Sequence, residues 1–293
     1  MKRRQFIRNT LSAAVAASLP LGSAWSSLRH SPTRVAGDVN ALSGEGAQVT
    51  LAQAEVQELS DALKGKLLLP GSEGYDEARL LLNPDFDKYP ALVVQPTGAA
   101  DVSTAVDFAR EYNLLTAVKC GGHSAAGAST CDGGLQIDLS RYRAVRVDRK
   151  AKTARVAGGS LLGELDHESM AHGLVTTAGT VSHTGVGGLA LGGGFGRLGR
   201  RFGLTLDNAL EFDIVTADGA LRRAAPDENP DLYWGLRGGG GNFGIVTSFL
   251  FRLHPMQRQV SHGVFQFPWS EARQVMNFFA CLLYTSPSPR DLN

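Results

Sequence analysis

Apolar runs and helical repeats alternate along the centre of the chain. The apolar run 91–95 predicts a strand, which the breakers Pro96-Thr97-Gly98 end. Over 99–112, apolar residues recur on one helical face and predict an amphipathic helix. A β-prone run, 114–118, follows this helix. This order predicts a βαβ unit with parallel strands and a right-handed crossover.

Short strand signals dominate the next part of the chain. Three of them, at 135–139, 144–147 and 153–156, are separated by turns and predict a meander. A helix is predicted over 161–172 and ends at Gly173.

A hairpin is predicted further along the chain, because Asp218-Gly219 separates the runs 209–217 and 221–224. A short helix is expected over 231–236. The segment 245–253 is rich in β-branched and aromatic residues and predicts a further strand.

The N-terminal part is less regular. Small and polar residues from 25 to about 48 predict a linker. Thr50 is a candidate cap for a helix that runs to residue 63, and a second short helix is predicted over 75–82.

The C-terminal part changes character after residue 280. Ser270 can cap an amphipathic helix over 270–280. We expect this helix to break at 281–293, because that segment carries Pro287 and Pro289. The segment resembles the translated read-through of a sequencing adapter, so we exclude it from the fold; a genuine proline-rich tail is the alternative. On this interpretation the natural protein continues beyond residue 280.

The first residues are typical of an export signal. Arg3-Arg4 precedes the mildly apolar run 11–21, and Gly22-Ser23-Ala24 offers small residues for cleavage. The pattern predicts a twin-arginine signal peptide over 1–24, a partner in the twin-arginine translocation machinery, and a periplasmic or secreted protein. An uncleaved membrane anchor is the alternative, but the apolar run is short for a membrane span.

Composition excludes several functional classes. With 43% hydrophobic residues, the 293-residue chain can bury a sizeable core, and its net charge of +1 gives no reason to expect nucleic acid or an acidic surface as a partner. Of the three cysteines, Cys281 lies in the excluded tail. Cys120 and Cys131 are too few for a disulfide framework and are expected to be ordinary thiols, although pairing stays open.

Glycine is the compositional outlier: 35 of the 293 residues are glycine, or about 12%, whereas proteins contain roughly 7% on average. Two clusters stand out, at 118–127 and 179–199. Glycine allows sharp turns and a close approach of the backbone to a ligand. Because His123 follows the paired glycines directly, we expect both clusters to hold one large phosphate-bearing cofactor, with His123 at its reactive end.

Two further motifs do not fit their usual context. Residues 194–199 match G-x-G-x-x-G with Asp218 about 20 residues later, but no clean strand precedes the glycines and Asp218 lies in a hairpin turn, so we do not expect a Rossmann site. His167 and His172 are five residues apart and would lie on different helical faces, so no metal site is predicted.

Four ordered motifs together resemble one family. They are Gly121-Gly122-His123-Ser124, Asp132-Gly133-Gly134-Leu135 with Asp138-Leu139-Ser140, Gly185-Val186-Gly187-Gly188 and Gly239-Gly240-Gly241-Asn242-Phe243-Gly244. Between about Tyr89 and Pro255, the chain resembles FAD-linked oxidoreductases of the vanillyl-alcohol oxidase type, and specifically the berberine-bridge-like enzymes. The resemblance implies an α+β fold with a PCMH-type FAD-binding domain, which combines a small parallel βαβ sheet with a mixed or antiparallel sheet.

The resemblance also implies a domain organisation. A linker with N-terminal helices would occupy 25–86, the FAD-binding domain 87–257, and only the start of a substrate domain 258–280. In the family, the catalytic base comes from the part beyond that point, so no catalytic residue is assigned, and His183 is only a candidate.

The family binds FAD covalently through the histidine of this first motif, which implies His123 here. Bicovalent members carry a second linking cysteine where this chain has Val181, so a single linkage is expected. The other implied cofactor-binding residues come from the glycine-rich clusters and the strand after them: Gly121, Gly122, Ser124, Thr180, Thr184, Gly185, Gly187, Gly188, Gly244, Ile245 and Val246.

The implied reaction is hydride transfer from a small-molecule substrate of the alcohol type, with carbohydrates as one class, to the flavin and then to dioxygen. Two alternatives stay open. The protein could be a dehydrogenase that uses another electron acceptor, or the chain as given could be a non-catalytic FAD-binding module.

Overall fold

The computed structural model describes residues 32–261 and 263–285. The twin-arginine segment 1–24 and the proline-containing residues 286–293 lie outside the described residues, so the structure bears on neither interpretation.

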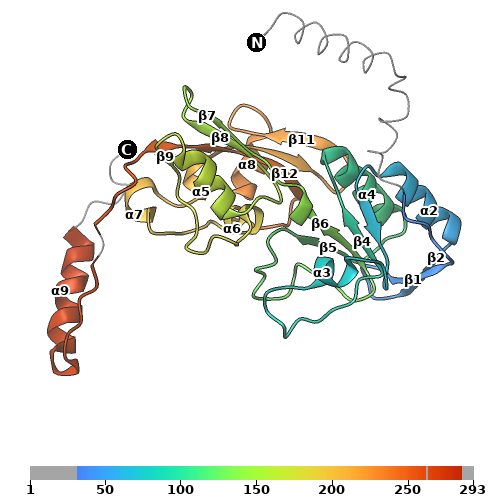
Figure 1. Cartoon of the computed structure of the whole chain (residues 1–293), viewed down its shortest axis with the longest axis horizontal. Helices are drawn as coiled ribbons and strands as arrows, with labels where there is room; N and C mark the ends of the chain where they lie inside the picture. Colours follow the sequence, from blue (N-terminus) through green and yellow to red (C-terminus); the bar gives the residue numbers. More distant parts are fainter. Residues whose placement is uncertain (1–31, 262, 286–293) are drawn as a thin grey trace, which may run out of the picture. The chain divides into compact units, whose positions relative to one another are not determined.

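A four-stranded sheet contains the predicted strand–helix–strand unit (Figure 1). Helix α4 (Ala99–Glu111) leads from one strand to the next, and three of the four strands are parallel, as expected. The first strand is antiparallel to its neighbour. In spatial order the strands are β3 (Lys66–Leu68), β4 (Leu92–Gln95), β6 (Leu135–Asp138) and β5 (Thr116–Lys119).

Strand β6 corrects the predicted meander. It lies between β4 and β5 and pairs with both in parallel, instead of continuing into the next strand of the chain. All four of its residues are buried, which suits a central strand covered on both faces. Only the other two predicted strands, β7 (Val145–Asp148) and β8 (Thr153–Ala157), form an antiparallel pair.

A five-stranded antiparallel sheet forms the second layer and contains the predicted hairpin. Three helices bury apolar side chains against it: α5 (Leu162–Met170), α6 (Val186–Leu191) and α8 (Pro230–Leu236). In spatial order its strands are β11 (Leu221–Ala224), β10 (Ala209–Val215), β12 (Ile245–Arg252), β8 and β7.

The linker prediction is wrong for the described part of the N-terminal segment. Strands β1 (Val39–Leu42) and β2 (Gln48–Leu51) form an antiparallel hairpin, and Leu51 is fully buried. Thr50 therefore belongs to a strand, and helix α2 (Gln53–Ala62) begins later than predicted. The predicted second helix is present as α3 (Tyr75–Arg79). Apolar residues of β1, β2, α2 and β3 belong to the core of the first sheet, among them Ala41, Leu51, Val56 and Leu67. Tyr75 and Ala78 of α3 form a smaller buried cluster with the neighbouring strands.

Several short elements complete the fold. They are η2 (Leu139–Arg141), β9 (Leu174–Val175), α7 (Gly199–Phe202), η3 (Leu206–Asn208), β13 (His254–Pro255) and η4 (Trp269–Glu271). The short strands β9 and β13 pair with each other as a two-stranded antiparallel sheet.

The C-terminal helix does not break where predicted. Helix α9 (Ala272–Thr285) continues through Cys281, because apolar residues extend its pattern up to Tyr284 before the prolines are reached. None of its residues is buried; Phe278 is 69% exposed. Among the described residues, no helix combines the length and the apolar character needed to cross a bilayer.

Hydrogen bonds of the Asp101 side chain join the start of α4 to the backbone just before β3. Its buried carboxylate accepts hydrogen bonds from the backbone N–H groups of Lys64 (2.9 Å), Gly65 (3.1 Å) and Thr97 (2.8 Å). The isosteric amide of an asparagine at this position would place its NH₂ group, itself a donor, against at least one of these backbone donors.

We predict that Asp101→Asn lowers the free energy of unfolding by about 3 kcal/mol, because buried donors lose a charged acceptor. Asp107→Asn on the same helix removes only an exposed ion pair with Arg110, and should cost less than about 1 kcal/mol. Urea unfolding of both variants measures this difference; equal losses would contradict this role of Asp101.

Candidate functional site

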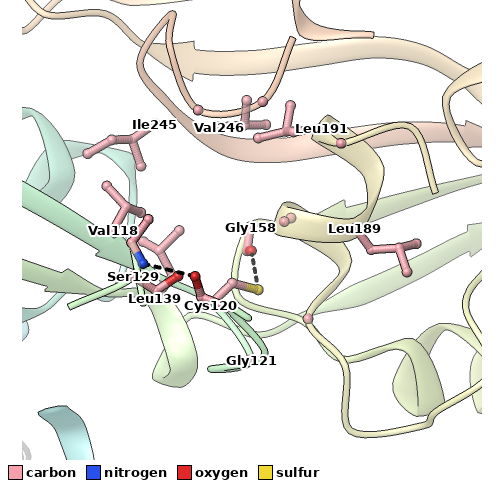
Figure 2. A pocket seen from close by; sticks show the side chains of 18 of the residues that line it. Val118, Cys120, Gly121, Ser129, Leu139, Gly158, Leu189, Leu191, Ile245 and Val246 are labelled. Carbon is pink, nitrogen blue, oxygen red and sulfur yellow. Dashed lines mark hydrogen bonds between the residues drawn. The ribbon is translucent and has the colours of Figure 1, made fainter. Parts of the chain in front are cut away.

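A cavity of about 650 Å³ lies where the two glycine-rich clusters meet (Figure 2). Its walls come from the end of β5 and the loop after it, from the loop and helix at 184–192, and from the loop and strand at 240–246. Leu139 and Gly158 complete the lining. The first of these loops leaves the carboxyl end of a parallel strand, where open α/β sheets place their ligands.

The two clusters touch backbone to backbone. A Cβ atom on Gly121 would overlap the backbone nitrogen of Gly185, and a Cβ atom on Gly185 would overlap both Gly121 and the sulfur of Cys120. Only glycine at both positions permits this approach. The contact therefore fixes the loop that carries His123 beside the start of α6.

Two imidazoles face each other at one end of the cavity wall. His123 Nε2 lies 2.5 Å from His183 Nδ1, and the ring centroids are 4.5 Å apart. The hydroxyl of Thr184 lies 3.4 Å from the other ring nitrogen of His123. Both nitrogens of His123 thus have partners, which fixes the orientation of its ring.

Burial is the main cause of a lowered pKa for His123, and the neighbouring His183 lowers it further. At neutral pH the His123 imidazole is therefore uncharged and keeps a lone pair on one nitrogen. An uncharged imidazole can act as a nucleophile, whereas an imidazolium cannot.

Cys120 forms part of the cavity wall (Figure 2). Its thiol donates a hydrogen bond to Gly158 O at 3.1 Å. Burial raises the pKa of this thiol, while the backbone N–H groups of Gly187, Gly121 and Gly188 act in the opposite direction. The effect of burial is the larger one, so the Cys120 thiol is held in its uncharged form.

Other lining glycines leave room for a ligand. At Gly188, Gly240 and Gly241, a Cβ atom would meet no atom within 4 Å. Among the described residues, the lining contains no carboxylate, lysine or arginine, and the cavity volume lies within the range of roughly 300–1,000 Å³ for cofactor sites. A backbone-lined cavity without carboxylates fits a cofactor with a pyrophosphate group, such as FAD.

The structure brings most of the predicted cofactor-binding residues together around this cavity. Thr180 is the exception, because it is exposed and does not line the cavity. His183 is also exposed and reaches the site through its contact with His123. The predicted residues that line the cavity are Gly121, Gly122, His123, Ser124, Thr184, Gly185, Gly187, Gly188, Gly244, Ile245 and Val246.

Sequence reasoning missed several lining residues. Gly158 lies outside the glycine-rich clusters and the quoted motifs, and nothing local in the sequence relates it to the cavity. Leu139 belongs to the quoted Asp138-Leu139-Ser140 segment but was not assigned to the site. Cys120, Ser129 and Asn242 lie inside or beside quoted motifs, so their proximity to the motif glycines was an available signal.

The G-x-G-x-x-G segment at 194–199 has no Rossmann context. Helix α6 precedes it, and Asp218 lies in the turn between β10 and β11, as expected. Within the described part of the chain, no group of three or more histidine, cysteine, aspartate or glutamate residues could hold a metal ion.

Comparison with known proteins agrees with this geometry. Residues 90–225 match the model of an FAD-binding domain family. An FAD-linked oxidoreductase of Dictyostelium discoideum is 37% identical over 239 residues, which are 81% of this chain and 52% of that protein.

Two solved structures share the fold. The crystal structure of 6-hydroxy-D-nicotine oxidase from Arthrobacter nicotinovorans has a TM-score of 0.71 at 32% identity, over 75% of this chain and 49% of that one. Glucooligosaccharide oxidase from Acremonium strictum, described with a 6-S-cysteinyl, 8α-N1-histidyl FAD, has a TM-score of 0.64 at 34% identity, over 67% and 42% of the respective chains.

The chain spans about half the length of the curated relatives it matches, and that half carries the FAD-binding fold. The family model, the relatives and the shared fold all indicate an FAD-binding domain. The chain therefore belongs to the FAD-linked oxidoreductases of the berberine-bridge-like and 6-hydroxynicotine oxidase family, and it consists mainly of their PCMH-type FAD-binding domain.

Proposed function

We propose that the full protein is an oxidase that transfers a hydride from an alcohol-type substrate, with carbohydrates as one class, to FAD bound covalently through His123. FAD supplies the redox chemistry, since it accepts hydride from a substrate C–H bond and passes electrons to dioxygen. The chain described here supplies the cofactor site. The observation that carries the proposal is His123 at the wall of a glycine-built cavity, with a partner at each ring nitrogen.

The relatives support this class of reaction. Oxidases of 6-hydroxy-D-nicotine and of glucooligosaccharide share the fold of this chain. Their substrates differ widely, so the shared part of the fold serves the cofactor rather than the substrate. For this reason the proposal names a broad substrate class.

His183 is the group best placed to handle the proton of His123. When His123 acts as a nucleophile through one ring nitrogen, its other nitrogen must give up a proton. The Nδ1 atom of His183, at 2.5 Å from His123 Nε2, can accept a proton held there. We assign His183 this supporting role, and no base for substrate oxidation among the described residues.

A single covalent linkage is proposed. Val181 occupies the position of the second linking cysteine, and its side chain carries no nucleophile. The thiol of Cys120, in the cavity wall, donates a hydrogen bond to Gly158 O. Cys131 is buried and does not line the cavity.

Two other functions share the same cofactor site. A dehydrogenase would use an acceptor other than dioxygen, and peroxide release by the full-length protein separates the two activities. A non-catalytic FAD-binding module is the other candidate for the chain by itself; among the described residues that line the cavity, His123 and Cys120 are the ionisable ones.

We further propose that the protein is exported by the twin-arginine machinery to the periplasm or beyond. This route carries folded proteins, so FAD would be loaded before export. The proposal is supported by the sequence pattern at Arg3-Arg4 alone.

We predict that His123→Ala abolishes covalent flavin. The parent chain, produced with FAD, should show a fluorescent flavin band on a denaturing gel, and the variant should show none. Cys120→Ala should keep the band, because that thiol is not expected to form a linkage. Flavin attached to the His123→Ala band would contradict the assignment.

A second prediction concerns stability of the flavin-free chain. Because the pKa of His123 is lower in the folded state, the unfolded state takes up this proton first as the pH falls. The contribution of His123 to the free energy of unfolding is fully present at a pH well above the ordinary histidine pKa of about 6.5. It is lost as the pH falls through and below that pKa.

Urea unfolding at about pH 7.5 and about pH 5.5 should therefore show a smaller loss of stability for His123→Gln than for the parent. His254, whose pKa is also lowered by burial, contributes equally to both chains. Equal losses in the two chains would contradict the lowered pKa of His123.

A further inference from the structure

Another cavity, of about 500 Å³, lies beside the short sheet of β9 and β13 and shares no lining residue with the cofactor cavity. The pairing of these two strands builds one side of it, and Met256 N continues the pairing by donating to Gly173 O at 3.0 Å. Arg201 lines the cavity from α7, and Gln257 and Gln259 line it from the segment after β13. The cavity therefore joins an arginine and two amide side chains from segments that are far apart in the sequence.

The lining side chains suit an anionic ligand. A guanidinium keeps its charge at any physiological pH, and its planar N–H groups match the oxygens of a carboxylate or a phosphate. The amides of Gln257 and Gln259 can donate hydrogen bonds to the same oxygens and can also accept them from hydroxyl groups. Among the described residues that form the lining, none is a carboxylate that would neutralise Arg201.

An aromatic stack holds the guanidinium of Arg201. Its Cζ atom lies 5.0 Å from the ring centroid of Phe202. The Phe202 ring in turn stacks on His254, with centroids 4.2 Å apart and planes 7° apart. A contact through the face of a guanidinium leaves the N–H groups at its edge available. The stack therefore restricts Arg201 without using its donors, which lowers the entropic cost of binding a ligand.

A buried amide fixes this stack to the fold. The NH₂ group of Asn208 donates to Phe202 O and to Leu204 O, both at 2.9 Å, so its oxygen has to act as an acceptor. His254 Nε2 lies 2.6 Å from that oxygen and therefore carries the proton of the neutral ring. Arg201 thus belongs to a connected set of side chains from α7, η3 and β13.

Positive charge accumulates around this set. Burial is the main cause of a lowered pKa for His254, and the guanidiniums of Arg252 and Arg201 lower it further. Within residues 32–261 and 263–285, neither of these arginines forms an ion pair. The described residues therefore leave a positive field beside the cavity, and a bound anion would offset it.

We propose that this cavity binds a small ligand that carries a carboxylate or a phosphate group, with Arg201 as the anchor of the anion and Gln257 and Gln259 as further hydrogen-bonding partners. Because the amides also suit hydroxyl groups, sugar acids and sugar phosphates fit the cavity. The site goes beyond the proposed oxidase function and does not depend on His123 or on its linkage to FAD.

The test titrates the full chain with three probes, inorganic phosphate, glucuronate and glucose, by isothermal calorimetry. Saturating FAD is present throughout, so that the glycine-lined cavity is not open to the probes. We expect saturable binding of one phosphate or one glucuronate per chain and no binding of glucose, because the anion carries the main interaction. The anion that binds more tightly identifies whether the ligand class bears a phosphate or a carboxylate.

Two matched variants locate the binding. Arg201→Gln should weaken it by about 10-fold, because the ligand loses charge-assisted hydrogen bonds. Arg197→Gln changes another exposed arginine, which lies just before α7 and does not line the cavity, and should bind as the parent does. Both replaced side chains are exposed, so both variants should fold, and circular dichroism checks this.

A second readout needs no variant. A titration of the histidine ring protons by NMR follows the pKa of His254 in the parent with and without the anion that binds. Because two guanidiniums lower this pKa, a bound anion should raise it. Arg201→Gln should also raise it, since one guanidinium is removed, and the added anion should then have little further effect.

The proposal would be overturned by a parent that binds neither anion saturably, by equal anion binding in a folded Arg201→Gln, or by glucose binding as tightly as the anions. An unchanged His254 pKa at a saturating anion concentration would also overturn it. Should Arg201→Gln fail to fold, this titration of the parent decides. A failure of FAD to bind would contradict the proposed function but not this site, because the comparison of Arg201→Gln with Arg197→Gln still locates the anion.

Discussion

The close contact between the backbones of Gly121 and Gly185 is the constraint on which the site depends. Each residue occupies the space that a Cβ atom on the other would need. One belongs to the loop after β5 of the parallel sheet, and the other directly precedes α6, which packs on the antiparallel sheet. The cavity, the placement of His123 and its partnership with His183 all follow from this contact, because each requires the two loops to share one position.

Around this contact, polar groups are arranged in two layers. The inner layer is almost entirely backbone and uncharged side chains, which suits a cofactor whose own charge is negative. The outer layer contains the buried charges, Lys119 and Asp138, beneath the turn rather than in the cavity. Among the described residues, this separation keeps the charged side chains out of the cavity lining.

The sequence predicted the helices and strands themselves better than it predicted which strands pair with one another. Strand, helix and hairpin signals at 91–118 and 209–224 depend on local periodicity, and the structure contains them. The position of β6 between β4 and β5 depends on long-range pairing that no local pattern encodes. The hairpin of β1 and β2 was missed because its small polar residues are typical of a linker. Helix α9 extends further than predicted because apolar residues continue beyond the expected break at residue 281.

The site was predictable to the extent that it consists of glycine motifs. Most lining residues lie in the two glycine-rich clusters or in the motif at 239–244. Gly158 enters only through folding, and Thr180 shares a glycine-rich cluster without facing the cavity. The most direct measurement is a titration of the flavin-free chain with FAD, followed by flavin fluorescence, in the parent, Gly185→Val and Gly37→Val, where an added Cβ meets no atom within 4 Å. We predict saturable binding of one FAD per chain in the parent and in Gly37→Val, and none in a folded Gly185→Val. Equal binding by Gly185→Val would contradict the account.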